Sequence, residues 1–235
     1  ARVVALSRHG EIPRSHEDPW RPRPATPAMT VDEFAAAEDK IAAVRARVAE
    51  SPLGWRQALD SMRPIHRELW LAMDDGTRRR FLDLRREWEV HRSRLAPGVE
   101  REVRAWEAEG RLEIRAARIG RIVASTAGLR IEVDGDRALH VDHLLLATGP
   151  SESPAESPLL ASTMATGLAR PGPFDLGIDV HPYDLRVRDA DGGEARPVWA
   201  LGPVVRGSVW ECIAIPEIRL QAVRIAEQVV AGPAP

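Results

Sequence analysis

The spacing of hydrophobic residues changes at Gly110, and this change constrains the possible folds more than any other feature of the sequence. Between Thr30 and Gly110 apolar residues recur every three or four positions, which is typical of amphipathic helices. From Arg111 to Val141 they alternate with polar residues, which is typical of strands. Another short strand is predicted at the start of the chain, over Arg2–Leu6. Strands on both sides of a helical block predict an α/β fold.

The helical block is predicted to begin at Thr30, which can form a capping box with Glu33. The first helix is expected to end at Ser51-Pro52. Further helical segments are predicted around residues 55–62, 65–73, 81–95 and 99–106. His91 lies in one of them among arginines and is interpreted as a packed or interfacial side chain. The arginine run at 78–80 is interpreted as a solvated face.

Composition excludes several classes of partner. A net charge of -2 argues against a general nucleic-acid binder. No apolar run approaches the length of a membrane span, so we expect no membrane partner. Cys212 is the only cysteine, which favours a reducing, cytoplasmic compartment. His9, His16, Glu17 and Asp18 lie in or beside a proline-rich loop without metal-ligand spacing, so we expect no metal site.

The first strand delivers the polar sequence Ser7-Arg8-His9-Gly10, and three interpretations remain open. Arg8-His9-Gly10 matches the signature of histidine phosphatases, with His9 as nucleophile and Arg8 holding the phosphate. Alternatively, this is the second strand of a dinucleotide-binding domain, where an arginine accepts the 2′-phosphate of NADP. The third interpretation is a polar strand end without a ligand. The phosphatase ranks second, because no second His-Gly follows a later strand.

A continuous apolar run, Leu144-Leu145-Leu146, leads into Ala147-Thr148-Gly149-Pro150. Such a run predicts a buried strand of parallel type. The glycine at its end allows a ligand to approach the backbone closely. Thr148, Gly149 and Pro150 are therefore candidate binding residues.

A second candidate site lies between Pro197 and Gln221. A strand at 198–201 is predicted to run into Gly202-Pro203, followed by a loop with Trp210 and a helix opened by Pro216. The unpaired N–H groups of that helix, including those of Glu217 and Ile218, could bind an anionic or electron-rich ligand. A crossover without ligand, with Trp210 as plain core, is the alternative. The predicted buried stripe of the helix is Ile218, Ala222, Ile225 and Val229.

Several motifs in this order resemble one family: ALSRHG at 5–10, WRQALDSMRP at 55–64, RREWEVHRSRLAP at 85–97, LLLATGP at 144–150 and LGPVVRGSVWECIAIPEIRLQA at 201–222. They are similar to the FAD/NAD(P)-binding flavoproteins with two dinucleotide-binding domains, in the branch that includes FAD-dependent urate hydroxylase-like proteins. The resemblance implies a Rossmann-like fold, FAD and NADP as cofactors and hydroxylation of a small-molecule substrate.

The resemblance also implies the cofactor-binding residues: Ser7, Arg8, Thr148, Gly149, Pro150, Gly202, Pro203, Trp210, Pro216, Glu217 and Ile218. Pro203 stands where many relatives carry an aspartate that contacts the ribityl chain, so this contact is not expected here. The sequence identifies no catalytic residue.

The chain lacks the Gly-x-Gly-x-x-Gly turns that hold the two pyrophosphates, because none of its glycines stands two residues from another. We therefore expect the C-terminal portion of such a flavoprotein. Residues 1–10 would be a strand of the nicotinamide domain, 11–110 a loop and helical insertion, 111–150 the strands returning to the FAD domain, and 151–235 part of the FAD domain. An N-terminal half or a partner chain would complete it, and FAD and NADP would bind only then. A non-catalytic binding module is a further alternative.

Overall fold

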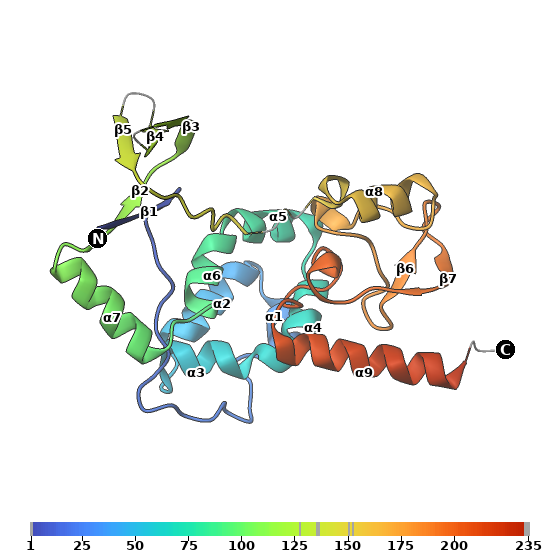
Figure 1. The fold of residues 1–235 in the computed structure, drawn as a ribbon. Helices are drawn as coiled ribbons and strands as arrows, with labels where there is room; N and C mark the ends of the chain where they lie inside the picture. Colours follow the sequence, from blue (N-terminus) through green and yellow to red (C-terminus); the bar gives the residue numbers. More distant parts are fainter. Residues whose placement is uncertain (1, 127, 135–136, 150, 152, 233–235) are drawn as a thin grey trace. The chain divides into compact units, whose positions relative to one another are not determined.

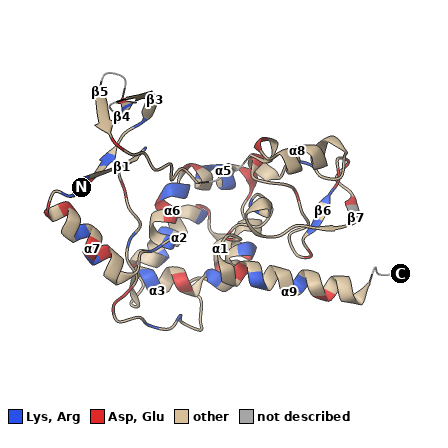
Figure 2. Cartoon of the chain, viewed as in Figure 1, with Lys and Arg blue, Asp and Glu red and all other residues tan. Residues whose placement is uncertain are grey.

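A computed structural model describes residues 2–126, 128–134, 137–149, 151 and 153–232 (Figure 1). The chain is a mixed α/β protein whose described strands form small sheets of two or three strands. It divides into two compact units. The first contains residues 1–25, 52–60 and 82–148, and the second contains residues 26–51, 61–81 and 149–235. Basic and acidic residues lie side by side along many helices (Figure 2).

The first unit contains a parallel strand pair at the chain's start. β1 (Val3–Ser7) pairs with β2 (Leu112–Ala116) so that Val3 faces Leu112 and Ser7 faces Ala116. The N–H of Ala117 donates to the carbonyl of Ser7 at 2.8 Å, just beyond the strands. This pair confirms the strand predicted for Arg2–Leu6, and it brings the carboxyl ends of two distant segments together.

A three-stranded antiparallel meander follows, formed by β3 (Ile119–Ser125), β4 (Gly128–Val133) and β5 (Arg137–Val141). The alternation of apolar residues predicted these strands correctly. Ile131 and Val133 are buried together with Ala117, and Leu6 and Leu144 pack against them. This small core therefore links the meander to the end of β1.

The helices of the first unit include most of α3 (Gly54–Ser61), α6 (Arg85–Arg92) and α7 (Pro97–Ala108). Arg94 has a side chain only 2% exposed and pairs with Asp60 at 2.8 Å. The ring of His91 packs edge-on against Trp55, with centroids 5.0 Å apart. The interpretation of His91 as a packed side chain is thus confirmed.

The strand predicted for Leu144–Leu146 is not observed. Only Leu144 packs into the small core, whereas Leu145 is 93% exposed and Leu146 is 71% exposed. A buried strand needs neighbouring strands to pair its backbone groups. The described part of the chain provides none for this segment. The apolar run therefore forms no strand, and two of its three leucines are exposed.

The second unit begins with α1 (Val31–Ala36) and α2 (Lys40–Ala49). The predicted capping box is present, with Thr30 accepting from the Glu33 N–H and the Glu33 carboxylate accepting from Thr30 N–H. The single helix predicted up to Ser51 was wrong: Asp39 caps the N–H groups of Ile41 and Ala42 and starts a second helix. Local hydrogen bonding by the aspartate outcompetes continuation of the helix.

Helices η1 (Arg63–Ile65), α4 (His66–Leu71) and α5 (Asp75–Asp83) follow. The predicted solvated face at 78–80 is only partly correct. Arg78 lies over the ring of Trp70 at 5.3 Å and donates to the carbonyls of Trp70 and Leu71. Arg80 pairs with Asp39 at 2.7 Å on an exposed surface. An arginine stem packs well on an aromatic ring, which explains why Arg78 is partly buried.

The C-terminal part of the second unit contains η2 (Pro154–Glu156), α8 (Pro158–Ala165), η3 (Pro173–Asp175), the hairpin β6 (Arg186–Arg188) and β7 (Glu194–Trp199), η4 (Gly202–Val205) and α9 (Ile215–Ala231). β6 and β7 pair antiparallel, with Arg186 opposite Trp199 and Arg188 opposite Glu194. The core lies between these elements and is built from Ala169, Ile178, Val180, Leu185, Val187, Val205, Val209 and Cys212.

The predicted inward stripe of α9 needs correction. Ile218 and Ile225 are partly buried, but Ala222 is exposed and Val229 is 57% exposed. Two glutamines take the inner positions instead. Gln221 accepts from the N–H of Gly202 at 2.7 Å, and Gln228 accepts from the indole N–H of Trp199 at 3.1 Å. These amides satisfy the buried N–H of Gly202 and the partly buried indole N–H of Trp199, which an apolar side chain would leave unpaired.

Candidate functional site

Gly202 and the first turn of α9 lie against each other in the second unit. Gly202 is buried and has a left-handed backbone with φ +77°. A Cβ built on Gly202 would lie 3.7 Å from the side chain of Ile218, which is ordinary contact. The backbone angle, and not the available space, therefore makes glycine necessary here. Pro203 follows inside η4.

The start of α9 agrees closely with the prediction, because Pro216 is in the first turn and the N-cap residue Ala214 provides no side-chain cap. One of the two predicted N–H donors is already used, however. The N–H of Ile218 donates to the Ala214 carbonyl at 3.0 Å and is already used within the helix. The carboxylate of Glu217 points to Arg63, whose Nη2 lies 2.5 Å from Oε1. This ion pair between η1 and α9 fixes the orientation of Glu217.

Trp210 lies in a buried aromatic cluster. Its ring stacks on Trp70, with centroids 5.2 Å apart and an interplanar angle of 24°, and meets Phe81 edge-on at 5.1 Å. Arg206 lies over Trp210 at 4.4 Å. Because Trp210 is only 4% exposed, its contacts favour a core role over direct contact with a ligand. Its Nε1 is a buried donor without a hydrogen-bond partner in the described part of the chain.

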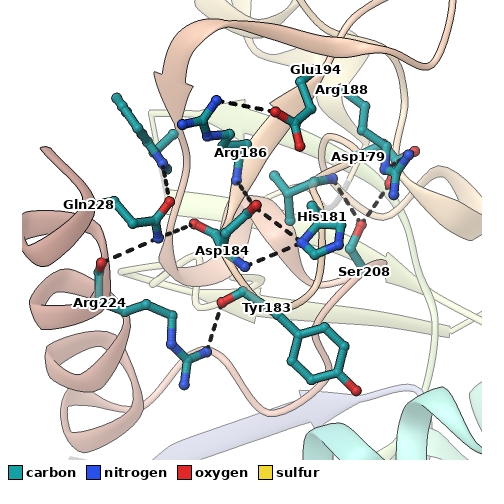
Figure 3. Close-up of polar contacts among 12 residues, drawn as sticks. Asp179, His181, Tyr183, Asp184, Arg186, Arg188, Glu194, Ser208, Arg224 and Gln228 are labelled. Atoms are coloured by element: carbon teal, nitrogen blue, oxygen red, sulfur yellow. Dashed lines mark hydrogen bonds and ion pairs between the residues drawn. The ribbon is translucent and has the colours of Figure 1, made fainter. Parts of the chain in front are cut away.

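A buried polar network that the sequence did not reveal lies beside the β6–β7 hairpin (Figure 3). Asp179 accepts from the Ser208 hydroxyl at 3.0 Å and from the Arg170 guanidinium at 2.6 and 2.8 Å. The Ser208 hydroxyl also accepts from the N–H of Val180 at 3.1 Å. These groups are far apart in sequence, so no short motif could have identified them.

This network has the chemistry of a structural ion pair. A nucleophilic serine needs a base that removes its proton. The Ser208 proton goes to an aspartate whose other oxygen is held by arginine. The nearby His181 makes a different contact, with Asp184 at 3.2 Å (Figure 3). Asp179 also lies 3.9 Å from the guanidinium of Arg188 on β6. The network therefore joins residues 170 and 179 to the hairpin and to Ser208.

The end of β1 forms a tight turn in the first unit. Ser7, Arg8 and His9 are exposed, and the Ser7 hydroxyl oxygen accepts from the Gly10 N–H at 2.9 Å. A Cβ on Gly10 would lie only 2.6 Å from the Ala116 nitrogen. Packing against the end of β2 is thus a sufficient reason for the glycine of the Arg-His-Gly motif, and no catalytic role is needed to explain it.

The candidates at the end of the apolar run fall where the two units divide, with Thr148 in the first unit and Gly149 in the second. Thr148 and Gly149 are exposed, and Gly149 has φ +74° with open space around its Cβ position. Pro150 lies outside the described residues. The left-handed glycine agrees with the turn expected there.

Two negative findings apply to the described residues. No group of three or more histidine, cysteine, aspartate or glutamate side chains has an arrangement that could hold a metal ion there. Within the same residues, every helix is too short or too polar to cross a membrane.

Cys212 gives a first testable prediction. The thiol is fully buried, and this burial raises its pKa to about 12. A thiol reagent attacks the thiolate, so folded protein should remain unlabelled near pH 9 and take up one label per chain in denaturant. Mass spectrometry measures both states. Rapid labelling of the folded protein would show that the core around Cys212 opens readily.

Comparisons with known proteins support the mixed α/β class of the fold. A scan against protein-family models gives no match, and neither does a search of curated proteins. Among solved structures, the chain is similar to the crystal structure of L-lysine 6-monooxygenase from Pseudomonas syringae, with a TM-score of 0.51 and 22% sequence identity. The match covers 72% of this chain and 41% of the monooxygenase chain, so this chain spans less than half of that protein. The chain therefore shares its mixed α/β fold with part of a monooxygenase.

Proposed function

We propose that this chain is the C-terminal portion of an FAD-dependent monooxygenase that uses NADPH to hydroxylate a small molecule. The observation that carries the proposal is the fold similarity to a monooxygenase over 72% of the chain. The order of the five sequence motifs points to the same class independently. FAD would supply the redox chemistry, and the protein would position it and shape its electrostatics.

The residues around Gly202 fit one border of a flavin site. Gly202 holds a left-handed turn, and Gln221 fixes that turn through the Gly202 N–H. The adjoining first turn of α9 is exposed at Pro216 and lacks a side-chain cap. A helix N-terminus favours negative charge, as develops on a reduced flavin. In this proposal Glu217 stays turned toward Arg63, and Trp210 supports the site from the aromatic cluster.

A nucleotide-binding half, on the same chain or on a partner, would complete the site. Two uncovered apolar surfaces support this. Leu145 and Leu146 are exposed, and so is the outer side of α9, with Ile215 82% and Val230 87% exposed. Surfaces of this kind commonly mark an interface.

Thiol labelling can test this interface, because Cys212 is buried and should not react. In the complete protein a cysteine at Leu145→Cys or Val230→Cys should be protected, whereas Arg101→Cys on α7 should react. Equal labelling at all three positions would argue that nothing covers these surfaces.

A substitution at Gly202 tests the flavin border. Gly202→Ala adds a side chain that fits the space but opposes φ +77°, at a cost of about 1–2 kcal/mol. The complete protein should fold and retain clearly less FAD, measured by visible absorbance per protein. Gly167→Ala is the matched control, with the same φ of +77° and a Cβ position 3.9 Å from Ala190. Full flavin content in a folded Gly202→Ala protein would place the cofactor elsewhere.

A further inference from the structure

We propose that Arg118 and Arg8 together form a two-arginine phosphate site, and that Arg118 is a second determinant of the preference for NADPH over NADH. This inference rests on the proposed function, which names NADPH as the reductant. The sequence suggested Arg8 alone, from its place after the first strand. Arg118 follows the second strand of the pair. Its position near Arg8 is known only from the pairing of the two strands in the structure.

The strand register places both arginines at one edge. β1 and β2 are parallel, with Ser7 opposite Ala116, so their carboxyl ends coincide. Arg8 follows Ser7 directly, and Arg118 comes two residues after Ala116. The Ala117 N–H donates to the Ser7 carbonyl at 2.8 Å, and this hydrogen bond holds together the segments that leave the two strands. Ligands of open α/β sheets bind beyond the carboxyl ends of parallel strands.

Both backbones are held in place. The Gly10 N–H donates to the Ser7 hydroxyl at 2.9 Å, and Gly10 packs so closely on Ala116 that a Cβ would lie 2.6 Å from its nitrogen. On the other strand, the Arg118 N–H donates to the Asp134 carboxylate at 2.9 Å. The Asp134 N–H donates back to the Arg118 carbonyl at 3.1 Å. Two arginines on fixed backbones lose less entropy when they bind a shared anion than mobile ones would.

The charges of these side chains remain uncompensated. Arg8 and Arg118 are both exposed, and in the described ranges neither guanidinium forms an ion pair or hydrogen bond. Their neighbours differ: Arg2 and Arg115 both pair with Glu113, at 2.7 and 2.5 Å. The Asp134 carboxylate beside Arg118 accepts from its backbone N–H and not from its guanidinium. Among the described residues, this edge of the strand pair therefore presents two guanidinium groups whose charges are not compensated.

Two arginine forks suit a phosphate dianion better than one. Guanidinium groups bind phosphate oxygens through paired, charge-assisted hydrogen bonds. The 2′-phosphate distinguishes NADPH from NADH, so the two arginines would act on that group alone. Removing one charge-assisted contact should weaken binding roughly tenfold.

Isothermal titration calorimetry of the complete protein with 2′,5′-ADP and with 5′-AMP tests the site directly. The wild-type protein should prefer 2′,5′-ADP, and Arg8→Ala and Arg118→Ala should each weaken its binding about tenfold without changing that of 5′-AMP. Arg118→Lys should retain part of the affinity, because it keeps the charge without the fork. Arg121→Ala is the matched control, since it removes another exposed arginine nearby on β3. Thermal unfolding of each variant verifies its fold.

Two results would overturn the inference. One is a complete wild-type protein that binds both nucleotides equally. The other is an Arg118→Ala variant that behaves like Arg121→Ala. The proposed function can fail separately. If the complete protein oxidises NADPH and Arg118→Ala leaves its NADPH-to-NADH preference unchanged, only the two-arginine site is wrong. If the complete protein neither binds flavin nor oxidises NADPH, the proposed function is wrong whatever the nucleotide titration gives.

Discussion

Gly177→Ala should destabilise the second unit by roughly 2–5 kcal/mol, the combined cost of a left-handed alanine and of overpacking. Gly177 has φ +70°, and a Cβ there would lie 1.9 Å from the carbonyl oxygen of Val204. That oxygen accepts the Ile178 N–H at 2.8 Å, so it cannot move away without breaking a backbone hydrogen bond. We therefore expect the upper part of the range. Chemical denaturation followed by circular dichroism measures the change.

Gly167→Ala separates the two contributions. It has a similar positive φ of +77°, but its Cβ would meet only the Ala190 side chain, at 3.9 Å. We expect a loss of about 1–2 kcal/mol, from backbone strain alone. Equal losses for Gly177→Ala and Gly167→Ala would contradict the close backbone approach between residues 177 and 204.

Asp179→Asn should destabilise the second unit by about 2–4 kcal/mol. Asp179 is 8% exposed and compensates the charge of Arg170 while accepting from Ser208. The neutral asparagine leaves the partly buried guanidinium of Arg170 without a counter-charge. Removing one partner of a buried ion pair is strongly destabilising, because the remaining charge is uncompensated. The Arg170 side chain is 39% exposed, so water offsets part of the loss. Urea denaturation monitored by tryptophan fluorescence provides the free energy of unfolding.

Glu194→Gln is the control for this charge change. Glu194 pairs with Arg186 at 3.1 Å on the same hairpin, but its side chain is 55% exposed (Figure 3). A surface pair contributes only about 0–1 kcal/mol. A loss as large as that of Asp179→Asn would mean that any charge removal near the hairpin is damaging. The buried network would then have no special role.

Local signals predicted much of the fold. The Thr30–Glu33 capping box, the helix of the Pro216 segment and the alternating strands after Gly110 are all observed, because short-range hydrogen bonds and side-chain period determine them. Errors occurred where local signals compete. Asp39 interrupts a continuous apolar stripe because its side chain caps a new helix.

Contacts between distant segments were not predictable in the same way. The Leu144–Leu146 run has the composition of a buried strand, but burial depends on neighbouring strands that the described chain lacks. The inner face of α9 contains Gln221 and Gln228, whose partners Gly202 and Trp199 are known only from the structure. Trp210 was named from its motif, yet its packing against Trp70 joins residues 140 positions apart, and no periodicity encodes that contact.

Anaerobic titration of the complete protein with NADPH tests the proposed monooxygenase role most directly. The protein should purify with bound FAD, NADPH should bleach the flavin absorbance, and admitting oxygen should restore it. This chain alone should be colourless, because it has no Gly-x-Gly-x-x-Gly turn for the FAD pyrophosphate. A complete protein that binds no flavin, or whose flavin NADPH does not reduce, would contradict the proposal.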